Sequence, residues 1–148
     1  MTIVVGGEAL IDLVPHEAGE LRAHAGGGPY NTARTLGRLE QDVHYLGCIS
    51  DDGFGGQLRA KLIEDGVKLD TVVETPLPTT LALAELDPRG AATYRFYSEG
   101  TSAPALEPEA ALAALPAALV AEEVLELLQP VTTRASAAAP AIADPILR

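Results

Sequence analysis

The stretch Gly26-Gly27-Gly28-Pro29-Tyr30-Asn31 leads into residues 31–40, where Ala33, Leu36 and Leu39 recur at helical spacing. Glycine tolerates positive φ and a close approach of the backbone, and the first amides of a helix have no partner within it. The stretch therefore predicts a loop that brings the backbone close to a small polar ligand at the start of a helix. Taken alone, a glycine-rich turn is more often only a structural link between strand and helix, and that alternative stays open at this point.

The segments on either side of this loop indicate alternating strands and helices. Residues 2–5 and 8–14 are expected to be extended, and residues 43–49 alternate as a strand does. The turn Asp51-Asp52-Gly53 leads into a helix, and Gly66 suits its left-handed C-terminal cap. The apolar stripe of this helix is predicted to consist of Leu58, Leu62 and Ile63. This order predicts an α/β layered fold with a mostly parallel sheet, whose binding loops lie at the carboxyl ends of the strands.

A β-hairpin is expected after these elements. Residues 79–86 and 91–97 alternate apolar and small side chains on either side of Asp87-Pro88-Arg89-Gly90. Proline and glycine favour a turn between two such runs. The hairpin interrupts the strand–helix alternation, so it is either an ordinary surface hairpin or part of a separate small sheet.

Three motifs occur in a recognisable order. They are Gly7-Glu8-Ala9-Leu10-Ile11-Asp12, the glycine-rich loop, and Gly47-Cys48-Ile49-Ser50-Asp51-Asp52-Gly53-Phe54-Gly55. In this order they resemble the ribokinase/PfkB carbohydrate kinases, particularly the fructokinase-like branch, over residues 2–106. The resemblance implies a ribokinase-like layered α/β fold with a mostly parallel sheet and a small β-sheet lid over the sugar, from which the C-terminal half is missing.

The resemblance also divides the chain into parts. The expected α/β core comprises residues 1–13 and 25–75, the expected lid residues 14–24 and 76–100, and the Ala/Pro-rich helical remainder of the core, truncated or gapped, residues 101–148. Within the remainder, Asp144-Pro145-Ile146-Leu147-Arg148 is similar to the family's Asp-Pro-Asn-x-Arg segment, with Ile146 in the place of the asparagine.

A sugar site follows from the same resemblance. Asp12 and Asn31 are implied to bind sugar hydroxyls, which suits a carboxylate and an amide because hydroxyls both donate and accept hydrogen bonds. The glycines of the loop are implied to give backbone contact and room; they are Gly26, Gly27 and Gly28. Tyr97 would cover the face of the sugar, with plain packing as its alternative. Ser98 stands where related kinases of keto-sugar acids have an arginine, which favours a neutral sugar.

The implied reaction is phosphoryl transfer from ATP to a sugar hydroxyl, with Mg²⁺ as a further cofactor. The family's catalytic Asp-Thr-x-Gly-Ala-Gly-Asp motif, which supplies the base and the anion hole, occurs nowhere in the 148 residues. We therefore assign no catalytic residue in this chain, expect the ATP-binding half outside it, and expect this stretch alone to be inactive. Lids of this family often pair two subunits, which implies a homodimer through the lid.

Composition disfavours several other classes of protein. The net charge of −11 and the pI near 4.5 disfavour nucleic-acid or anionic-membrane partners, and no segment is long enough to span a bilayer. Cys48 is the only cysteine, so no internal disulfide can form; we expect it in the core of a cytoplasmic protein. The histidines are too scattered for a metal site and are expected to be exposed; they are His16, His24 and His44.

Two hypotheses about function come from different classes. In the first, the chain is the sugar-binding and lid part of an ATP-dependent sugar kinase. In the second, it is a non-catalytic sugar- or nucleoside-binding module. A third hypothesis, in which the hairpin serves only to dimerise the protein, predicts no saccharide binding.

Overall fold

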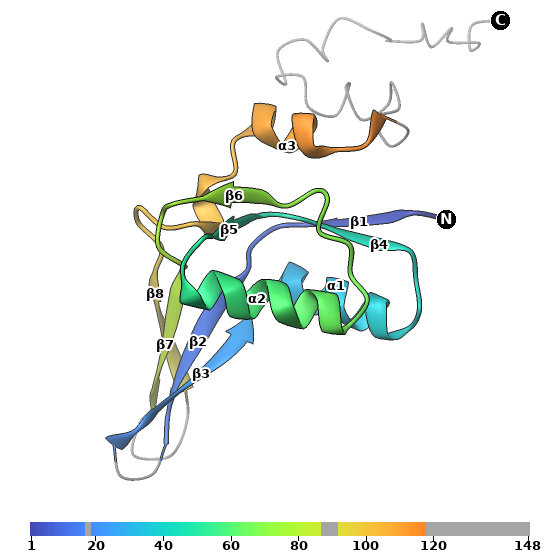
Figure 1. Ribbon diagram of the computed structural model, residues 1–148. Coiled ribbons are helices and arrows are strands. Elements are labelled where there is room, and N and C mark those ends of the chain that lie inside the picture. Colours follow the sequence, from blue (N-terminus) through green and yellow to red (C-terminus); the bar gives the residue numbers. More distant parts are fainter. Residues whose placement is uncertain (17–18, 87–91, 118–148) are drawn as a thin grey trace, which may run out of the picture. The chain divides into compact units, whose positions relative to one another are not determined.

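A computed structural model describes residues 1–16, 19–86 and 92–117, in which strands and helices alternate (Figure 1). The elements in chain order are β1 (Ile3–Gly6), β2 (Leu10–Pro15), β3 (Leu21–Gly26), α1 (Gly28–Arg38), β4 (Val43–Leu46), β5 (Cys48–Ser50), α2 (Gly53–Glu64), β6 (Val73–Thr75), β7 (Leu81–Leu86), β8 (Ala92–Tyr97), the 3₁₀ turn η2 (Ala103–Ala105) and α3 (Pro108–Ala114). The predicted elements between residues 118 and 148 lie outside the described residues.

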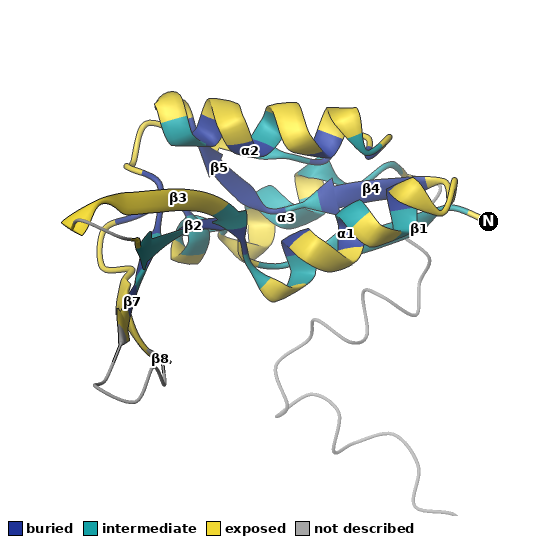
Figure 2. Cartoon of the chain, turned by 90° about the horizontal axis from the view of Figure 1, so that it is seen from below, coloured by how far each residue is buried: buried dark blue, intermediate teal, exposed yellow. Residues whose placement is uncertain are grey.

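Short parallel strand pairs form the centre of the fold. Strand β1 pairs with β4, and β5 pairs with β6, both in parallel. Helices α1 and α2 lie together on one side of these strands and α3 lies on the other (Figure 1). Strands β4 and β5 are buried between the helices, whereas β3 is largely exposed (Figure 2). The predicted α/β layered fold with mostly parallel pairing is confirmed.

A second, four-stranded sheet projects from this centre in the order β3-β2-β7-β8. Strand β2 pairs in parallel with β7, while β2–β3 and β7–β8 are antiparallel pairs. The predicted hairpin is therefore confirmed as β7–β8, although its turn at residues 87–90 lies outside the described residues. Strands β2 and β3 run unbroken through the boundaries expected at residues 13–14 and 24–25, because their ladder starts at Leu10 and Gly26. The division into core and lid stays a prediction.

The ends of α2 follow the predicted capping pattern. Asp52 is its N-cap, and the side chain accepts a hydrogen bond from the Gly55 N–H at 2.7 Å. Gly66 adopts φ 81° after the last turn, and the Val67 N–H donates to the Leu62 carbonyl in a Schellman motif. The predicted stripe is wrong at Ile63, which is 64% exposed, because it lies about 100° around the helix from Leu62.

Two other expectations differ from the structure. Residues 43–49 form two strands rather than one, since the chain changes partner at Gly47, from β1 to β6. His44 is buried, and its Nδ1 lies 2.6 Å from the Asp70 carboxylate, so the exposure expected for it is wrong.

Cys48 is buried as expected, and burial raises the pKa of its thiol, which fits a core residue better than a nucleophile.

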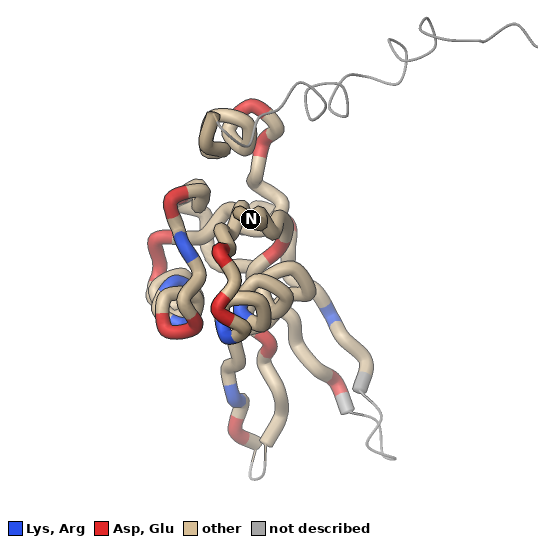
Figure 3. The backbone as a smooth tube through the Cα atoms, turned by 90° about the vertical axis from the view of Figure 1, so that its right-hand side faces the viewer, with Lys and Arg blue, Asp and Glu red and all other residues tan. Residues whose placement is uncertain are grey.

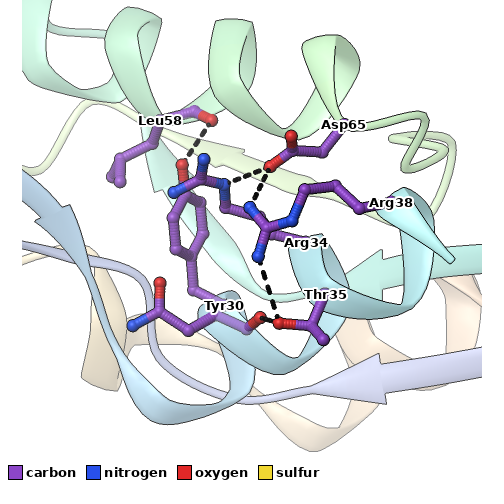
Figure 4. Close-up of polar contacts among 7 residues, drawn as sticks. Tyr30, Arg34, Thr35, Arg38, Leu58 and Asp65 are labelled. Atoms are coloured by element: carbon purple, nitrogen blue, oxygen red, sulfur yellow. Dashed lines mark hydrogen bonds and ion pairs between the residues drawn. The ribbon is translucent and has the colours of Figure 1, made fainter.

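A polar cluster fastens α1 to α2 (Figure 4). Arg34 Nε and Arg38 Nη1 lie 2.6 Å and 3.2 Å from Asp65 Oδ2, and Asp65 caps the end of α2. The Tyr30 hydroxyl donates to the Leu58 carbonyl at 3.0 Å. The helix that carries the glycine-rich loop is thus held at its first turn and again one turn later.

Helix α1 ends on a residue that is poorly suited to its conformation. Glu40 adopts φ 57° in the same Schellman arrangement that Gly66 occupies after α2. A non-glycine residue costs about 1 kcal/mol there, and its negative charge faces the negative end of the helix dipole. We predict that Glu40→Gly raises the free energy of unfolding by about 1 kcal/mol, measured by urea denaturation. Glu64→Gly is the control, because it places glycine inside the last turn of α2 and should lower the free energy of unfolding by a similar amount. A loss of stability in both variants would contradict the prediction.

Asp52 also joins α2 to the segment that enters β7. Its carboxylate accepts hydrogen bonds from the Thr79 N–H at 2.8 Å and the Thr79 hydroxyl at 2.7 Å. Burial acts to raise the pKa of Asp52, but hydrogen bonds from Thr79, Gly55 and Ser50 outweigh it and lower the pKa to about 2.

The lowered pKa of Asp52 predicts a pH-dependent contribution to stability. Because the folded-state pKa lies below the unfolded value of 3.8, the stabilisation is fully present above that value and is lost as the pH falls towards 2. Asp52→Asn should therefore lower the free energy of unfolding by about 1 kcal/mol at pH 7, and the difference from wild type should shrink between pH 4 and pH 2. Asp51→Asn, at the exposed neighbouring carboxylate, is the control. A difference that persists unchanged at pH 2 would refute the role of the ionised carboxylate.

Candidate functional site

A pocket of about 270 Å³ opens on one face of the four-stranded sheet, beside the start of α1. Its lining combines carboxylates, glycine backbone and aromatic rings. The lining residues are Glu8, Leu10, Asp12, Gly27, Gly28, Tyr94 and Phe96. Strand β2, the glycine-rich loop and strand β8 of the hairpin therefore all contribute walls to one cavity.

The alternation of side chains along the strands explains how these residues meet. Successive side chains of a strand point to opposite faces, so Leu10 and Asp12 share a face of β2, and Tyr94 and Phe96 share a face of β8. Strand β7 lies between them, and Ala82 is paired both with Asp12 and with Phe96. The three side chains therefore share one face of the sheet, with the small, buried Ala82 between the carboxylate and the aromatic ring.

The glycines of the loop are there for steric reasons. Gly27 is the N-cap residue of α1 with φ 112°, which an L side chain rarely adopts, and a Cβ on it would lie 2.5 Å from the Glu8 carbonyl oxygen. A Cβ on Gly26 would collide with the Asp12 carboxylate. Glycine at these positions thus makes room for Asp12 and lets the loop approach the segment at Glu8 that leads into β2.

The start of α1 differs from the prediction in two ways. The helix begins at Gly28 rather than at Asn31, because Pro29 presets the helical φ in the first turn. The Gly28 N–H donates to Glu8 Oε1 at 3.1 Å, and Pro29 has no N–H. Two positions of the helix start therefore offer no free N–H to ligand oxygens, and the role of the loop in ligand binding stays a prediction.

The predicted site residues fall into two groups. The structure brings Asp12, Gly27 and Gly28 together in the pocket, with Gly26 packed against Asp12. Asn31 is exposed on the first turn of α1 and does not line the pocket.

Tyr97 does not line the pocket either, because it follows Phe96 in β8 and therefore points to the opposite face of the sheet. Sequence reasoning had missed four of the lining residues, namely Glu8, Leu10, Tyr94 and Phe96. The alternation of residues 8, 10 and 12, and of residues 94 and 96, is the pattern that could have found them.

The pocket has an acidic character. Its two carboxylates are Glu8 and Asp12, and its lining contains no Lys, Arg or His. Burial raises the pKa of Asp12, and the nearby His24, which is paired with it across β2 and β3, opposes that shift. A neutral or cationic ligand suits such a lining better than an anion.

A second hollow of about 370 Å³ shares three lining residues with the first, namely Glu8, Leu10 and Phe96. It extends past Thr80 and Ser98 to Leu106 and also lacks basic lining residues. The two hollows offer a ligand one continuous, mostly apolar wall around Phe96.

The described residues carry neither a metal cluster nor a spanning helix. No group of three or more His, Cys, Asp or Glu side chains among them could hold a metal ion. None of the described helices is both long and apolar enough to cross a bilayer. Basic and acidic positions are interspersed along the described elements (Figure 3).

Comparison with known proteins places the chain in a family. Residues 2–148 match the pfkB family of carbohydrate kinases. A fructokinase of Rhizobium leguminosarum bv. trifolii is 40% identical over 104 residues, which cover 68% of this chain and 32% of the relative. A 5-dehydro-2-deoxygluconokinase of Photobacterium profundum is 31% identical over 115 residues, covering 72% of this chain and 34% of the relative. The crystal structure of the Xylella fastidiosa fructokinase with bound ATP superposes with a TM-score of 0.69 at 33% identity, covering 74% of this chain and 34% of that one.

The chain thus spans about a third of the length of these relatives. Both the sequence relatives and the structure confirm the resemblance that the three ordered motifs indicated. The chain belongs to the pfkB family of carbohydrate kinases, in its fructokinase-like branch.

Proposed function

We propose that the parent protein phosphorylates a monosaccharide hydroxyl with ATP, as a fructokinase-like sugar kinase, and that this chain carries its sugar-binding and lid part. The observation that carries the proposal is the pocket in which Asp12, the backbone of Gly27 and Gly28, and the ring of Phe96 meet. A sugar ring carries hydroxyl groups and also has an apolar face. Hydrogen-bond acceptors, a closely approaching backbone and an aromatic surface together suit such a ligand.

Each wall of the pocket has a proposed role. Asp12 accepts hydrogen bonds from sugar hydroxyls, and Gly27 and Gly28 allow the sugar to lie against the backbone. Phe96 covers the apolar face of the sugar, a role for which its position suits it better than that of Tyr97. Asn31 remains a proposed ligand for a sugar hydroxyl, because it is exposed on the first turn of α1, three residues after Gly28.

ATP and Mg²⁺ are proposed as cofactors of the parent protein; ATP would supply the phosphoryl group and Mg²⁺ would neutralise its charge. The residues that the structure describes do not fit either group. The described residues hold no cluster of metal ligands, and the Gly-Ala-Gly-Asp anion hole does not occur in the sequence. We therefore derive no step of phosphoryl transfer from this chain and assign it no catalytic residue.

A homodimer through the lid and a cytoplasmic location are also proposed. Support for the dimer comes from large apolar side chains that are exposed on the edge strands of the four-stranded sheet: Leu21 on β3 and Tyr94, Phe96 and Tyr97 on β8. A second copy packed on these strands would remove apolar surface from water. Phe96 would then serve both the pocket and the interface.

The proposed function predicts a substrate preference. With fructose as acceptor, the parent protein should form ADP from ATP, whereas gluconate and fructose 6-phosphate should give little or none, because the lining carries two carboxylates and no cation. Coupled measurement of ADP formation tests this prediction. Fructose binding by calorimetry without ADP formation would favour the alternative, a non-catalytic sugar- or nucleoside-binding module; no binding of any saccharide would leave only the interaction module.

Asp12 allows a test that separates binding from folding. Asp12→Asn should weaken fructose binding at least about tenfold, since an ionised acceptor is replaced by a neutral amide. Because burial raises the folded-state pKa of Asp12 above 3.8, the ionised carboxylate opposes folding at neutral pH, so the same substitution should leave the free energy of unfolding unchanged or slightly higher. Calorimetry and urea denaturation at pH 7 measure the two effects, with the exposed Asp51→Asn as control. An unchanged fructose affinity in the folded variant would remove Asp12 from the site.

A further inference from the structure

Two fully buried tyrosines lie beneath the segments that form the pocket. Tyr30 and Tyr45 are each 0% exposed, and their rings meet edge to face with centroids 6.1 Å apart at 84°. Tyr30 belongs to the glycine-rich loop and α1, whereas Tyr45 belongs to β4. The pair therefore joins the loop to the central strands. Aromatic rings prefer this edge-to-face arrangement, so the contact also fixes the orientation of the two rings.

The hydroxyl of Tyr45 fixes the segment that precedes β2. It donates a hydrogen bond of 2.7 Å to the carbonyl oxygen of Gly7. Burial raises the pKa of Tyr45, so the hydroxyl stays protonated and remains a donor. Gly47 keeps this contact open, since a Cβ there would lie 2.6 Å from the hydroxyl oxygen and 2.7 Å from the Gly7 carbonyl oxygen.

The Gly7–Glu8 segment in turn holds the glycine-rich loop. A Cβ on Gly7 would collide with the side-chain ring of Pro29, so the Gly7 backbone packs directly against this ring. Glu8 Oε1 accepts a hydrogen bond from the Gly28 N–H at 3.1 Å. Glu8 and Gly28 both line the pocket, so a shift of the Gly7 carbonyl would also shift two lining residues.

The hydroxyl of Tyr30 fastens the other side of the pair. It donates to the Leu58 carbonyl on α2 at 3.0 Å, and the Arg34 guanidinium lies over its ring at 5.6 Å from the centroid (Figure 4). The two hydroxyls thus bind different segments, one α2 and the other the segment that leads into β2. The pair can neither slide nor turn without breaking a buried hydrogen bond.

We propose that Tyr45, supported by Tyr30, is a positioning residue for the sugar pocket, acting through Gly7 and Glu8 on the backbone of Gly28. The effect of Tyr45 on sugar binding rests on the proposed function. Its effect on the position of Gly28 does not. Loss of the Tyr45 hydroxyl frees the Gly7 carbonyl, loosens Glu8 and leaves Gly28 less well held against the bound sugar.

The structural part is tested by amide hydrogen exchange in Tyr45→Phe, which keeps the ring and removes only the hydroxyl. The Gly28 amide should exchange about tenfold faster, which corresponds to the loss of one hydrogen bond. The Gly55 amide, which also donates to a carboxylate in the first turn of a helix, should be unchanged. If Tyr45→Phe does not fold, Tyr30→Phe serves instead, with the same expected change at Gly28.

The functional part is tested by fructose binding to the full parent protein. Tyr45→Phe should raise the Kd for fructose about tenfold without changing the KM for ATP. Thr71→Val is the matched control, because the Thr71 hydroxyl donates a buried hydrogen bond of the same length, 2.7 Å, to the carbonyl of Tyr45 and not to that of Gly7. In a Glu8→Ala background, which weakens binding by itself, Tyr45→Phe should add no more than about twofold, since its effect passes through Glu8.

The outcomes separate the two proposals. Faster Gly28 exchange together with weaker fructose binding supports the inference. Unchanged Gly28 exchange, or an equal loss of affinity in Thr71→Val, overturns it, and faster exchange with unchanged affinity overturns the link to binding. Failure of the wild-type protein to bind fructose counts against the proposed function, while the exchange at Gly28 still decides whether Tyr45 positions the loop.

Discussion

The fold depends on the close approach of two backbone segments, residues 7–8 and residues 26–29. Pro29 packs where a side chain of residue 7 would be, and the Glu8 carbonyl lies where a side chain of residue 27 would be. Only glycine fits at both places, and Gly27 also needs a positive φ. The contact fixes the segment that leads into β2 against the start of α1, so the four-stranded sheet is attached to the α/β layers beside the pocket.

A second attachment joins the start of α2 to the segment that leads into β7. The carboxylate of Asp52 caps α2 and also binds the backbone and hydroxyl of Thr79, which leads into β7. Strands β2 and β7 are neighbours in the sheet, so both are fixed to the core at the ends that line the hollows. The parts of the sheet farther from the core have no comparable anchor among the described contacts. These attachments therefore lie at the end of the sheet that lines the hollows.

Local patterns predicted the elements better than they predicted which residues meet. Capping and glycine signals identified α2, and alternation identified the β7–β8 hairpin, because these depend on neighbours in sequence. The change of partner at Gly47 and the burial of His44 depend on contacts from Val73 and Asp70, which no local window contains. At the site, a shift of one residue from Tyr97 to Phe96 moves a side chain to the other face of the sheet, so Phe96 lines the pocket and Tyr97 does not; the role of Tyr97 in sugar binding stays a prediction.

The residues around Asp12 fit binding better than they fit stability. Asp12 lies among Leu10, Ala82 and Phe96 on the pocket face, where burial raises the pKa of its carboxyl and an apolar residue would stabilise the sheet more. Gly26 is paired with Leu10 on the neighbouring strand, and its lack of a side chain leaves room for the Asp12 carboxylate. Proteins tolerate such local losses mainly where a ligand interaction compensates for them. A carboxylate that is partly desolvated adds little to the stability of the fold, and this is the physical reason why we propose Asp12 as a binding group.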